Sequence, residues 1–217
     1  MVLRRCRNMR VADHDFETVG SETVYRGKIL AMRADEVRMP GGAVAVREVV
    51  EHYGAVAVVA VDDDLRLAMV YQYRHAVGRR LWELPAGLLD EPGEDAAVAA
   101  ARELREEAGV VAGDWRVLID AISSPGFSDE AVRVFLARDL SHVPRPEASD
   151  EEADLTVDWI ALPEAVDRVL AGEIVNAIGA AGVLAAHAVL VDGKPTRPVD
   201  TPWPDRPGAF VARKAGR

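Results

Sequence analysis

The sequence predicts an α+β fold, arranged as a layered α/β/α sandwich with an additional antiparallel β-sheet at its N-terminal end. Strand-like segments rich in β-branched residues occupy most of positions 16–73. Apolar residues at helical spacing follow between positions 94 and 108, and again after position 163. Strands with helices grouped after them are typical of folds in which helices cover a sheet.

The strands expected in the first third of the chain are separated by turn residues. Gly27 and Pro40-Gly41-Gly42 interrupt β-branched segments, and the second interruption has the composition of a hairpin turn. The apolar run AVAVVAV is expected of a strand that is buried on both faces. The expected strands cover residues 23–25, 29–37, 44–50, 55–61 and 66–73.

The later elements are predicted from helical periodicity and helix boundary residues. Apolar residues repeat at helical spacing up to Ala108, and Gly109 stands where a left-handed cap ends a helix. Pro163 favours a helix start. Residues 139–154 are polar and acidic, and are expected to form a long loop. The expected strands are 115–122, 131–137 and 155–160, and the expected helices are 94–108, 163–170 and 174–190.

Four regions are therefore expected along the chain. Residues 1–15 are polar and without pattern, which indicates a flexible tail. Residues 16–53 form an N-terminal β region, and residues 54–191 form the main domain. Several prolines after residue 191 predict that residues 192–217 are an extended tail.

Composition excludes several classes of protein. The chain of 217 residues has a formal net charge of −10, whereas nucleic-acid binders usually carry a basic face. No apolar run reaches the roughly 18 residues that a membrane span needs. The basic N-terminus is not followed by the apolar region of a secretory signal. We therefore expect no nucleic-acid or membrane partner and a cytoplasmic location.

An acidic face on the predicted helix 94–108 is the first indication of chemistry. Glu103 and Glu107 are four residues apart and lie on one face of a helix, with Glu106 beside them. Like charges at this spacing cost a few tenths of a kcal/mol per pair, roughly, unless a cation lies between them. Mg²⁺ prefers such oxygen ligands together with water and substrate phosphate. A solvated acidic face, paired locally with Arg102 and Arg105, is the alternative.

The segment around this helix resembles the Nudix box, the motif of hydrolases that cut nucleoside diphosphates linked to another moiety. The motif runs from glycine through a spacer to glutamate, then seven residues to Arg-Glu-apolar-any-Glu-Glu-any-Gly-apolar. One departure is visible, because residues 88–93 form a spacer of six residues where five are usual. Loops tolerate such insertions best. The matching residues are Gly87, Glu94, Arg102, Glu103, Leu104, Glu106, Glu107, Gly109 and Val110.

This resemblance implies a Nudix-type α/β/α sandwich and a metal-dependent reaction. Glu103 and Glu107 resemble the metal ligands of the family, with Glu106 as a further or supporting ligand and the backbone carbonyl of Ala86 completing the site. Mg²⁺ is the expected ion, with Mn²⁺ as an alternative. By the same resemblance Arg102 orients a motif glutamate through a salt bridge. The resemblance implies a structural role for three further motif residues, Gly87, Glu94 and Gly109.

Three further stretches resemble the ADP-ribose pyrophosphatase branch of the family, in particular its actinobacterial members. Pro125 lies at the distance beyond the box where this branch has a proline, although an ordinary turn is the alternative. Residues 84–87 resemble the lead-in to the box. Residues 71–74 resemble the strand end whose arginine, here Arg74, reaches the substrate. The resemblance implies hydrolysis of ADP-ribose to AMP and ribose 5-phosphate.

The branch also implies a homodimer in which N-terminal strands exchange and both chains build the pocket. Residues 16–53 would then serve dimerisation, and Arg47 would reach a phosphate or the adenosine, with a plain exposed strand arginine as the alternative. Phe127 is expected to line the ribose pocket or to pack in the core. The catalytic base tends to come from a loop after the box, which favours Glu151, with Glu152 second. Solvated loop charges are the alternative for both.

Three other functions compete with this hypothesis. The first is a broader nucleoside diphosphate sugar diphosphatase. The second is a nucleotide-sensing module of the same fold without catalysis, which usually lacks motif glutamates that are present here. The third is an acidic protein that binds a partner and no ligand.

Overall fold

The computed structural model describes residues 14–145 and 154–215, and within them the strands form three sheets. The first contains β1 (Thr18–Arg26), β2 (Leu30–Arg38) and β3 (Val44–His52). The second has the order β10 (Thr156–Ala161), β5 (Arg66–Arg74) and β6 (Arg79–Glu83). The third has the order β11 (Arg197–Pro198), β8 (Val110–Ile122), β9 (Ala131–His142), β4 (Ala55–Ala60) and β7 (Ala86–Leu88).

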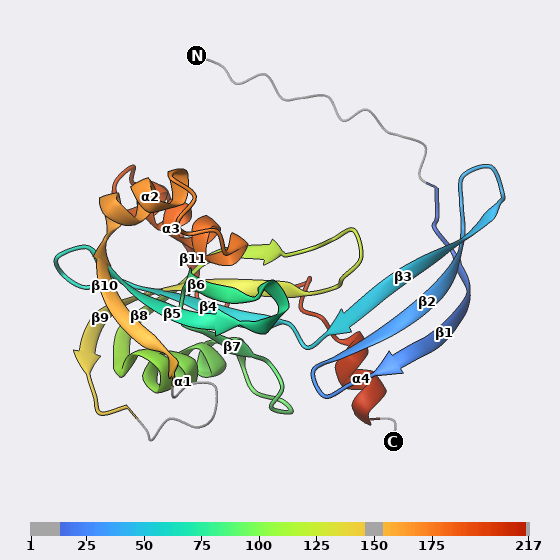
Figure 1. The fold of residues 1–217 in the computed structure, drawn as a ribbon, viewed down its shortest axis with the longest axis horizontal. Helices are drawn as coiled ribbons and strands as arrows, with labels where there is room; N and C mark the ends of the chain where they lie inside the picture. Colours follow the sequence, from blue (N-terminus) through green and yellow to red (C-terminus); the bar gives the residue numbers. More distant parts are fainter. Residues whose placement is uncertain (1–13, 146–153, 216–217) are drawn as a thin grey trace, which may run out of the picture.

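The N-terminal sheet is antiparallel and stands beside the rest of the molecule (Figure 1). The predicted hairpin is confirmed, because β2 pairs with β3 along its whole length, from Leu30 with His52 to Arg38 with Val44. The turn between these strands contains Gly41 and Gly42, whose φ angles of 95° and 90° are costly for any other residue.

Helices cover both faces of the central sheets, as the predicted sandwich requires (Figure 1). Strand β4 lies between β9 and β7, and Val56 to Ala60 are fully buried, as the continuous apolar run predicts. Alternate residues of β4 face opposite sides. Val56 and Val58 pack with α1 (Ala96–Ala108), whereas Ala57 and Val59 pack in the core with α2 (Leu162–Leu170) and α3 (Ala177–Leu190).

The boundaries of α1 follow from its capping residues. The side chain of Asp95 accepts a hydrogen bond from the backbone N–H of Ala97, which is the usual contact of a helix N-cap. Gly109 ends the helix in the left-handed conformation, with φ 64° and ψ 38°, as predicted. The third helix begins later than the predicted residue 174, because Asn176 caps it by accepting from the N–H of Gly179.

Two predictions about irregular segments were wrong. The loop expected from residue 139 begins later, because residues up to His142 continue β9 and pair with the first residues of β8. The tail expected to be extended contains β11 and a short helix, α4 (Ala209–Ala215). A helix of this length has little stability of its own, and packing of buried Phe210 against Ala31 and Tyr53 provides it. The sequence also failed to predict β7.

No helix in the described part of the chain has the length and apolar character needed to cross a membrane.

Candidate active site

The first part of the site forms where helix α1 packs on strand β7. Strand β7 pairs with β4, which places Gly87 opposite Val56 and Ala86 opposite Ala57. A Cβ atom on Gly87 would lie 1.9 Å from Oε1 of Glu103, a separation that no side chain tolerates. The Glu103 carboxylate therefore occupies the space that the missing side chain leaves, and glycine is required here for close approach.

Glu107 approaches the same strand one helical turn later. Its Oε2 accepts a hydrogen bond from the backbone N–H of Ala86 at 2.9 Å. The residue is 6% exposed, so its carboxylate is buried at the floor of the site. Two carboxylates spaced four residues apart on α1 thus meet the backbone of Ala86 and Gly87, as their positions in the sequence suggested.

Arg102 connects the acidic residues of the box. Its guanidinium donates to Glu94 at 3.2 and 3.1 Å, to Glu103 at 2.7 Å and to Glu106 at 3.3 Å. The hydrogen bonds that Arg102 donates to Glu94, followed by the charges of Glu103 and Glu94, raise the pKa of Arg102 despite its partial burial. The longer spacer still places Glu94 against Arg102, so the extra residue is absorbed before the helix.

A cavity of about 950 Å³ opens beside these carboxylates. Its lining includes Ala86, Gly87, Glu103 and Glu107 from the box segment. Such a volume is typical of sites for small molecules of nucleotide size.

Strands β5 and β6 supply another wall of the cavity. Arg74 donates to the two carboxylate oxygens of Glu83, from Nε at 3.0 Å and from Nη2 at 2.7 Å. Gln72 donates to the same carboxylate at 3.3 Å. Glu83 is 3% exposed, and a carboxylate so buried requires such partners. The predicted Arg74 and the box carboxylates therefore line one cavity.

The sequence did not predict the third wall of the cavity. It includes His52 at the end of β3, Glu130 just before β9, and Ile29. Nδ1 of His52 accepts from the N–H of Gly54 at 3.2 Å and lies 3.6 Å from Oε1 of Glu130. Ser123 also contacts the Glu130 carboxylate through its hydroxyl. These residues are far apart in the sequence and have no motif spacing, so no sequence pattern could have identified them.

The oxygen atoms at the floor of the site are of the kind that can bind a divalent cation. Carboxylate oxygens of Glu103 and Glu107 and the carbonyl of Ala86 are the hard oxygen ligands that Mg²⁺ takes. Within the described ranges, no three His, Cys, Asp or Glu side chains are gathered closely enough to hold a metal ion by themselves. Mg²⁺ commonly uses only one or two carboxylates and fills its remaining positions with water and substrate phosphate.

Several predicted site residues lie elsewhere. Glu106 contacts Arg102 and is not among the described residues that line the cavity. Arg47 is exposed on β3, where it donates to the carbonyl of Val46. Phe127 is 58% exposed, which excludes the alternative that it packs in the core of this chain. Neither Arg47, Phe127 nor the exposed Pro125 belongs to the described cavity lining. Glu151 and Glu152 lie outside the described residues.

Two known family models match the chain. The model of the NUDIX domain matches residues 50–177, which include the cavity floor and α1. The model of the nucleoside diphosphate sugar hydrolase N-terminal domain matches residues 16–50, which form the N-terminal sheet.

Similar proteins agree with the family models. Over 207 residues the chain is 61% identical to an ADP-ribose pyrophosphatase of Mycobacterium tuberculosis, an alignment that covers 95% of this chain and 100% of that protein. It is 38% identical over 161 residues to an ADP-ribose pyrophosphatase of Bacillus subtilis, covering 74% of this chain and 86% of that protein. A crystal structure of an ADP compounds hydrolase has the same fold, with a TM-score of 0.73 at 22% identity over 83% of this chain and 96% of that one. The chain belongs to the Nudix family.

Proposed function

We propose that this protein hydrolyses ADP-ribose to AMP and ribose 5-phosphate with the help of Mg²⁺, for which Mn²⁺ can substitute. The observation that carries the proposal is the meeting of Glu103 and Glu107 with the backbone of Ala86 and Gly87 at the floor of a cavity. The names of relatives 61% and 38% identical to this chain support ADP-ribose as the substrate.

The residues at the floor would hold the metal ion. Glu103, Glu107 and the carbonyl of Ala86 would provide its protein ligands, with Glu106 in a supporting position through Arg102. When bound, the ion would neutralise charge on the diphosphate and lower the pKa of a nearby water. Nudix hydrolases generally depend on a divalent cation, and the hard oxygen ligands here favour Mg²⁺.

Hydrolysis then requires a base and a substrate held in place. Water attacks one phosphorus, a P–O bond of the anhydride breaks, and the proton of the water passes to a carboxylate. We assign this carboxylate to Glu151 or, second, to Glu152, both outside the described residues. Arg74 lines the cavity and can donate to a phosphate oxygen, because guanidinium groups recognise phosphate well.

The remaining assignments concern assembly. We propose that two copies of this chain form a homodimer through residues 16–53. In that assembly Arg47, Pro125 and Phe127 would contact the substrate. We also propose that the protein acts in the cytoplasm. Exposed apolar residues of the N-terminal sheet support the interface, since large exposed apolar patches commonly mark contacts between proteins. They are Val19, Val24, Tyr25, Val44 and Val46.

The decisive experiment is product analysis after incubation of ADP-ribose with the protein and Mg²⁺. We expect AMP and ribose 5-phosphate in equal amounts, and no turnover after chelation of divalent ions. Incubation in ¹⁸O-labelled water identifies the phosphorus that is attacked. Absence of cleavage at saturating Mg²⁺ and ADP-ribose would contradict the proposal.

A broader substrate range is the second candidate. A relative from Streptomyces rubellomurinus, 32% identical over 166 residues, is named a hydrolase of a CMP-linked phosphonate, so relatives at this distance differ in substrate. Comparison of kcat/KM for ADP-ribose, ADP-glucose, GDP-mannose and NADH separates the two candidates. Similar values for all four would favour the broader enzyme.

A further inference from the structure

The C-terminal helix α4 lies against the base of the N-terminal sheet (Figure 1). Phe210 is fully buried, and its ring meets the ring of Tyr53 edge-on with centroids 4.7 Å apart. Ala31 of β2 completes this small apolar cluster. The contact joins residues more than 150 positions apart in the sequence and fixes α4 to the end of β3.

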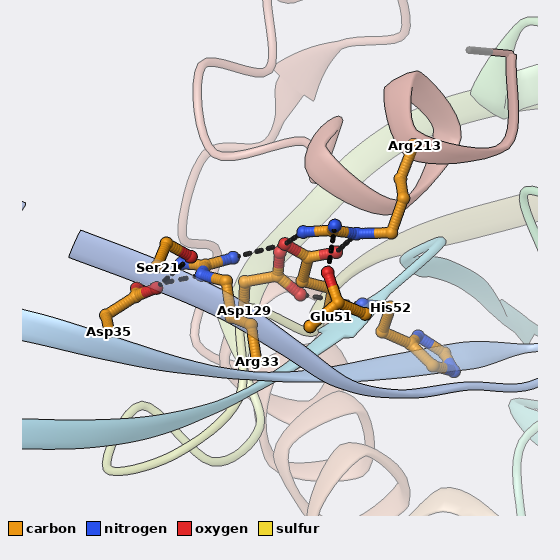
Figure 2. Close-up of polar contacts among 8 residues, drawn as sticks. Ser21, Arg33, Asp35, Glu51, His52, Asp129 and Arg213 are labelled. Atoms are coloured by element: carbon orange, nitrogen blue, oxygen red, sulfur yellow. Dashed lines mark hydrogen bonds and ion pairs between the residues drawn. The ribbon is translucent and has the colours of Figure 1, made fainter.

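Arg213 of α4 pairs with the buried carboxylate of Glu51 across this interface. Its Nε and Nη2 donate to the two carboxylate oxygens of Glu51 at 2.6 and 2.7 Å (Figure 2). Glu51 is 1% exposed and accepts a further hydrogen bond from Arg33. A carboxylate buried to this degree must be paired to remain charged, so both guanidinium groups are needed to hold it in place.

Arg213 and its neighbour Lys214 also contact the other strands of the sheet. Nη1 of Arg213 donates to Oγ1 of Thr23 on β1 at 2.6 Å. Nζ of Lys214 donates to the carbonyl of Lys28 at 2.6 Å and contacts the hydroxyl of Tyr53. Helix α4 therefore holds the β1–β2 turn and the end of β3 together.

These anchored positions are directly next to residues that line the cavity. Ile29 follows Lys28, and His52 lies between Glu51 and Tyr53; both belong to the cavity lining. Lys214 holds the carbonyl of Lys28, and Arg213 holds the carboxylate of Glu51. These two contacts restrict the backbone next to Ile29 and next to His52. None of the α4 residues lines the cavity, so any effect of α4 on the site is indirect.

The end of β3 also holds the segment that leads to Glu130. The N–H of Val50 donates to the carbonyl of Phe127 at 2.7 Å, and the N–H of Asp129 donates to the carbonyl of Val50 at 3.1 Å. The N–H of His52 donates to the Asp129 carboxylate at 2.8 Å (Figure 2). A shift of β3 near Glu51 would therefore move the backbone before Glu130 as well.

We propose that α4 positions the cavity wall formed by Ile29, His52 and Glu130, and that Arg213 is the positioning residue through its pair with Glu51. The inference rests on the proposed function, since that wall lines the same cavity as the box carboxylates and would contact the bound substrate. Loss of Arg213 leaves the buried Glu51 carboxylate with Arg33 as its remaining arginine. The carboxylate then turns toward Arg33 or toward water, and the end of β3 loses its fixed place.

The test compares Arg213→Met and Arg213→Lys with a matched control, Arg197→Met. Arg197 belongs to the same C-terminal segment and donates to Asp120 at 2.7 Å, and neither residue lines the cavity. We expect Arg213→Met to raise KM for ADP-ribose about tenfold while kcat changes less than about twofold, because the box carboxylates are untouched. Arg213→Lys, which keeps the charge but loses the paired donors, should give an intermediate KM. The control should keep the KM of the unaltered protein.

Amide hydrogen exchange provides a second measurement that needs no turnover. In Arg213→Met, exchange should accelerate in residues 28–31, 50–53 and 127–129, and should remain unchanged in those residues of the control. If α4 only stabilised the fold, Arg213→Met and Arg213→Lys would lower the melting temperature without changing KM well below that temperature. This result would overturn the inference. So would unchanged exchange in the three segments. Failure of the unaltered protein to cleave ADP-ribose would overturn the proposed function instead, and hydrogen exchange would still decide whether Arg213 holds this wall.

Discussion

Arg74 and Glu83 join the end of β5 to β6 through two hydrogen bonds inside the candidate active site. Glu83 is buried, whereas Arg74 is partly exposed to the cavity, so the carboxylate holds the guanidinium at the surface that a substrate would meet. This arrangement leaves the arginine charged and oriented before any ligand binds, which reduces the entropy lost on binding.

Replacement of Arg74 by lysine should weaken substrate binding and stability together. Lysine keeps the positive charge but cannot make both hydrogen bonds to Glu83. We expect a loss of about 1–3 kcal/mol in the free energy of unfolding, the usual effect of a lost hydrogen bond to a buried charged group. Urea unfolding and the KM for ADP-ribose measure the two effects. Arg79→Lys, at the exposed position opposite Arg74 in the strand register, is the control and should change neither.

Substitution of Gly87 by alanine should abolish most activity. The new Cβ would lie 1.9 Å from the Glu103 carboxylate, so this carboxylate would have to leave its position against β7. We expect kcat to fall about 100-fold or more, as when one preorganised charged group is lost from an active site. Gly208→Ala meets no atom within 4 Å and serves as the control. Turnover by Gly87→Ala at the rate of the unaltered protein would show that the Glu103 position is not required.

Glu107→Gln should lower kcat by about 100-fold or more while the protein stays folded. Glutamine keeps the shape of the side chain and can still accept the hydrogen bond from Ala86, but it removes the negative charge that a cation needs. Steady-state kinetics with titrated Mg²⁺ measures kcat and the apparent affinity for the ion. Glu164→Gln, an exposed carboxylate on α2, controls for the loss of one negative charge. Near-normal turnover of Glu107→Gln would remove Glu107 from the metal site.

The Glu51 carboxylate should make stability depend on pH in the acid range. Its hydrogen bonds from Arg213, which outweigh the effect of burial, hold the pKa of Glu51 below its ordinary value of 4.5. A lowered pKa in the folded state stabilises the protein at pH values above about 4.5, and this contribution is lost as the pH falls through the folded-state pKa. Urea unfolding of the unaltered protein should therefore show a falling free energy of unfolding below about pH 4.5.

The matching variant for this measurement is Glu51→Gln. It should be less stable than the unaltered protein at pH 7, and the difference between the two should shrink toward pH 3, because protonation removes the same charge that the substitution removes. A constant difference over this range would show that the Glu51 charge does not contribute to stability.

The sequence by itself determined the local elements of the site. Helical spacing placed Glu103 and Glu107 on one face of α1, and Gly109 and the apolar run of β4 marked a helix end and a buried strand. Each of these features depends on residues close together in the chain, whose geometry follows from the period of a helix or a strand.

Only the tertiary structure decided which distant residues share the cavity. His52 and Glu130 line it because β3 pairs with the segment before β9, and Glu83 meets Arg74 because β5 pairs with β6. Helix α4, which the sequence predicted as extended tail, exists through packing of Phe210 and pairing of Arg213 with Glu51. Contacts of this kind join positions up to 190 residues apart, and their energy appears only after the sheets have formed, so no local pattern in the sequence records them.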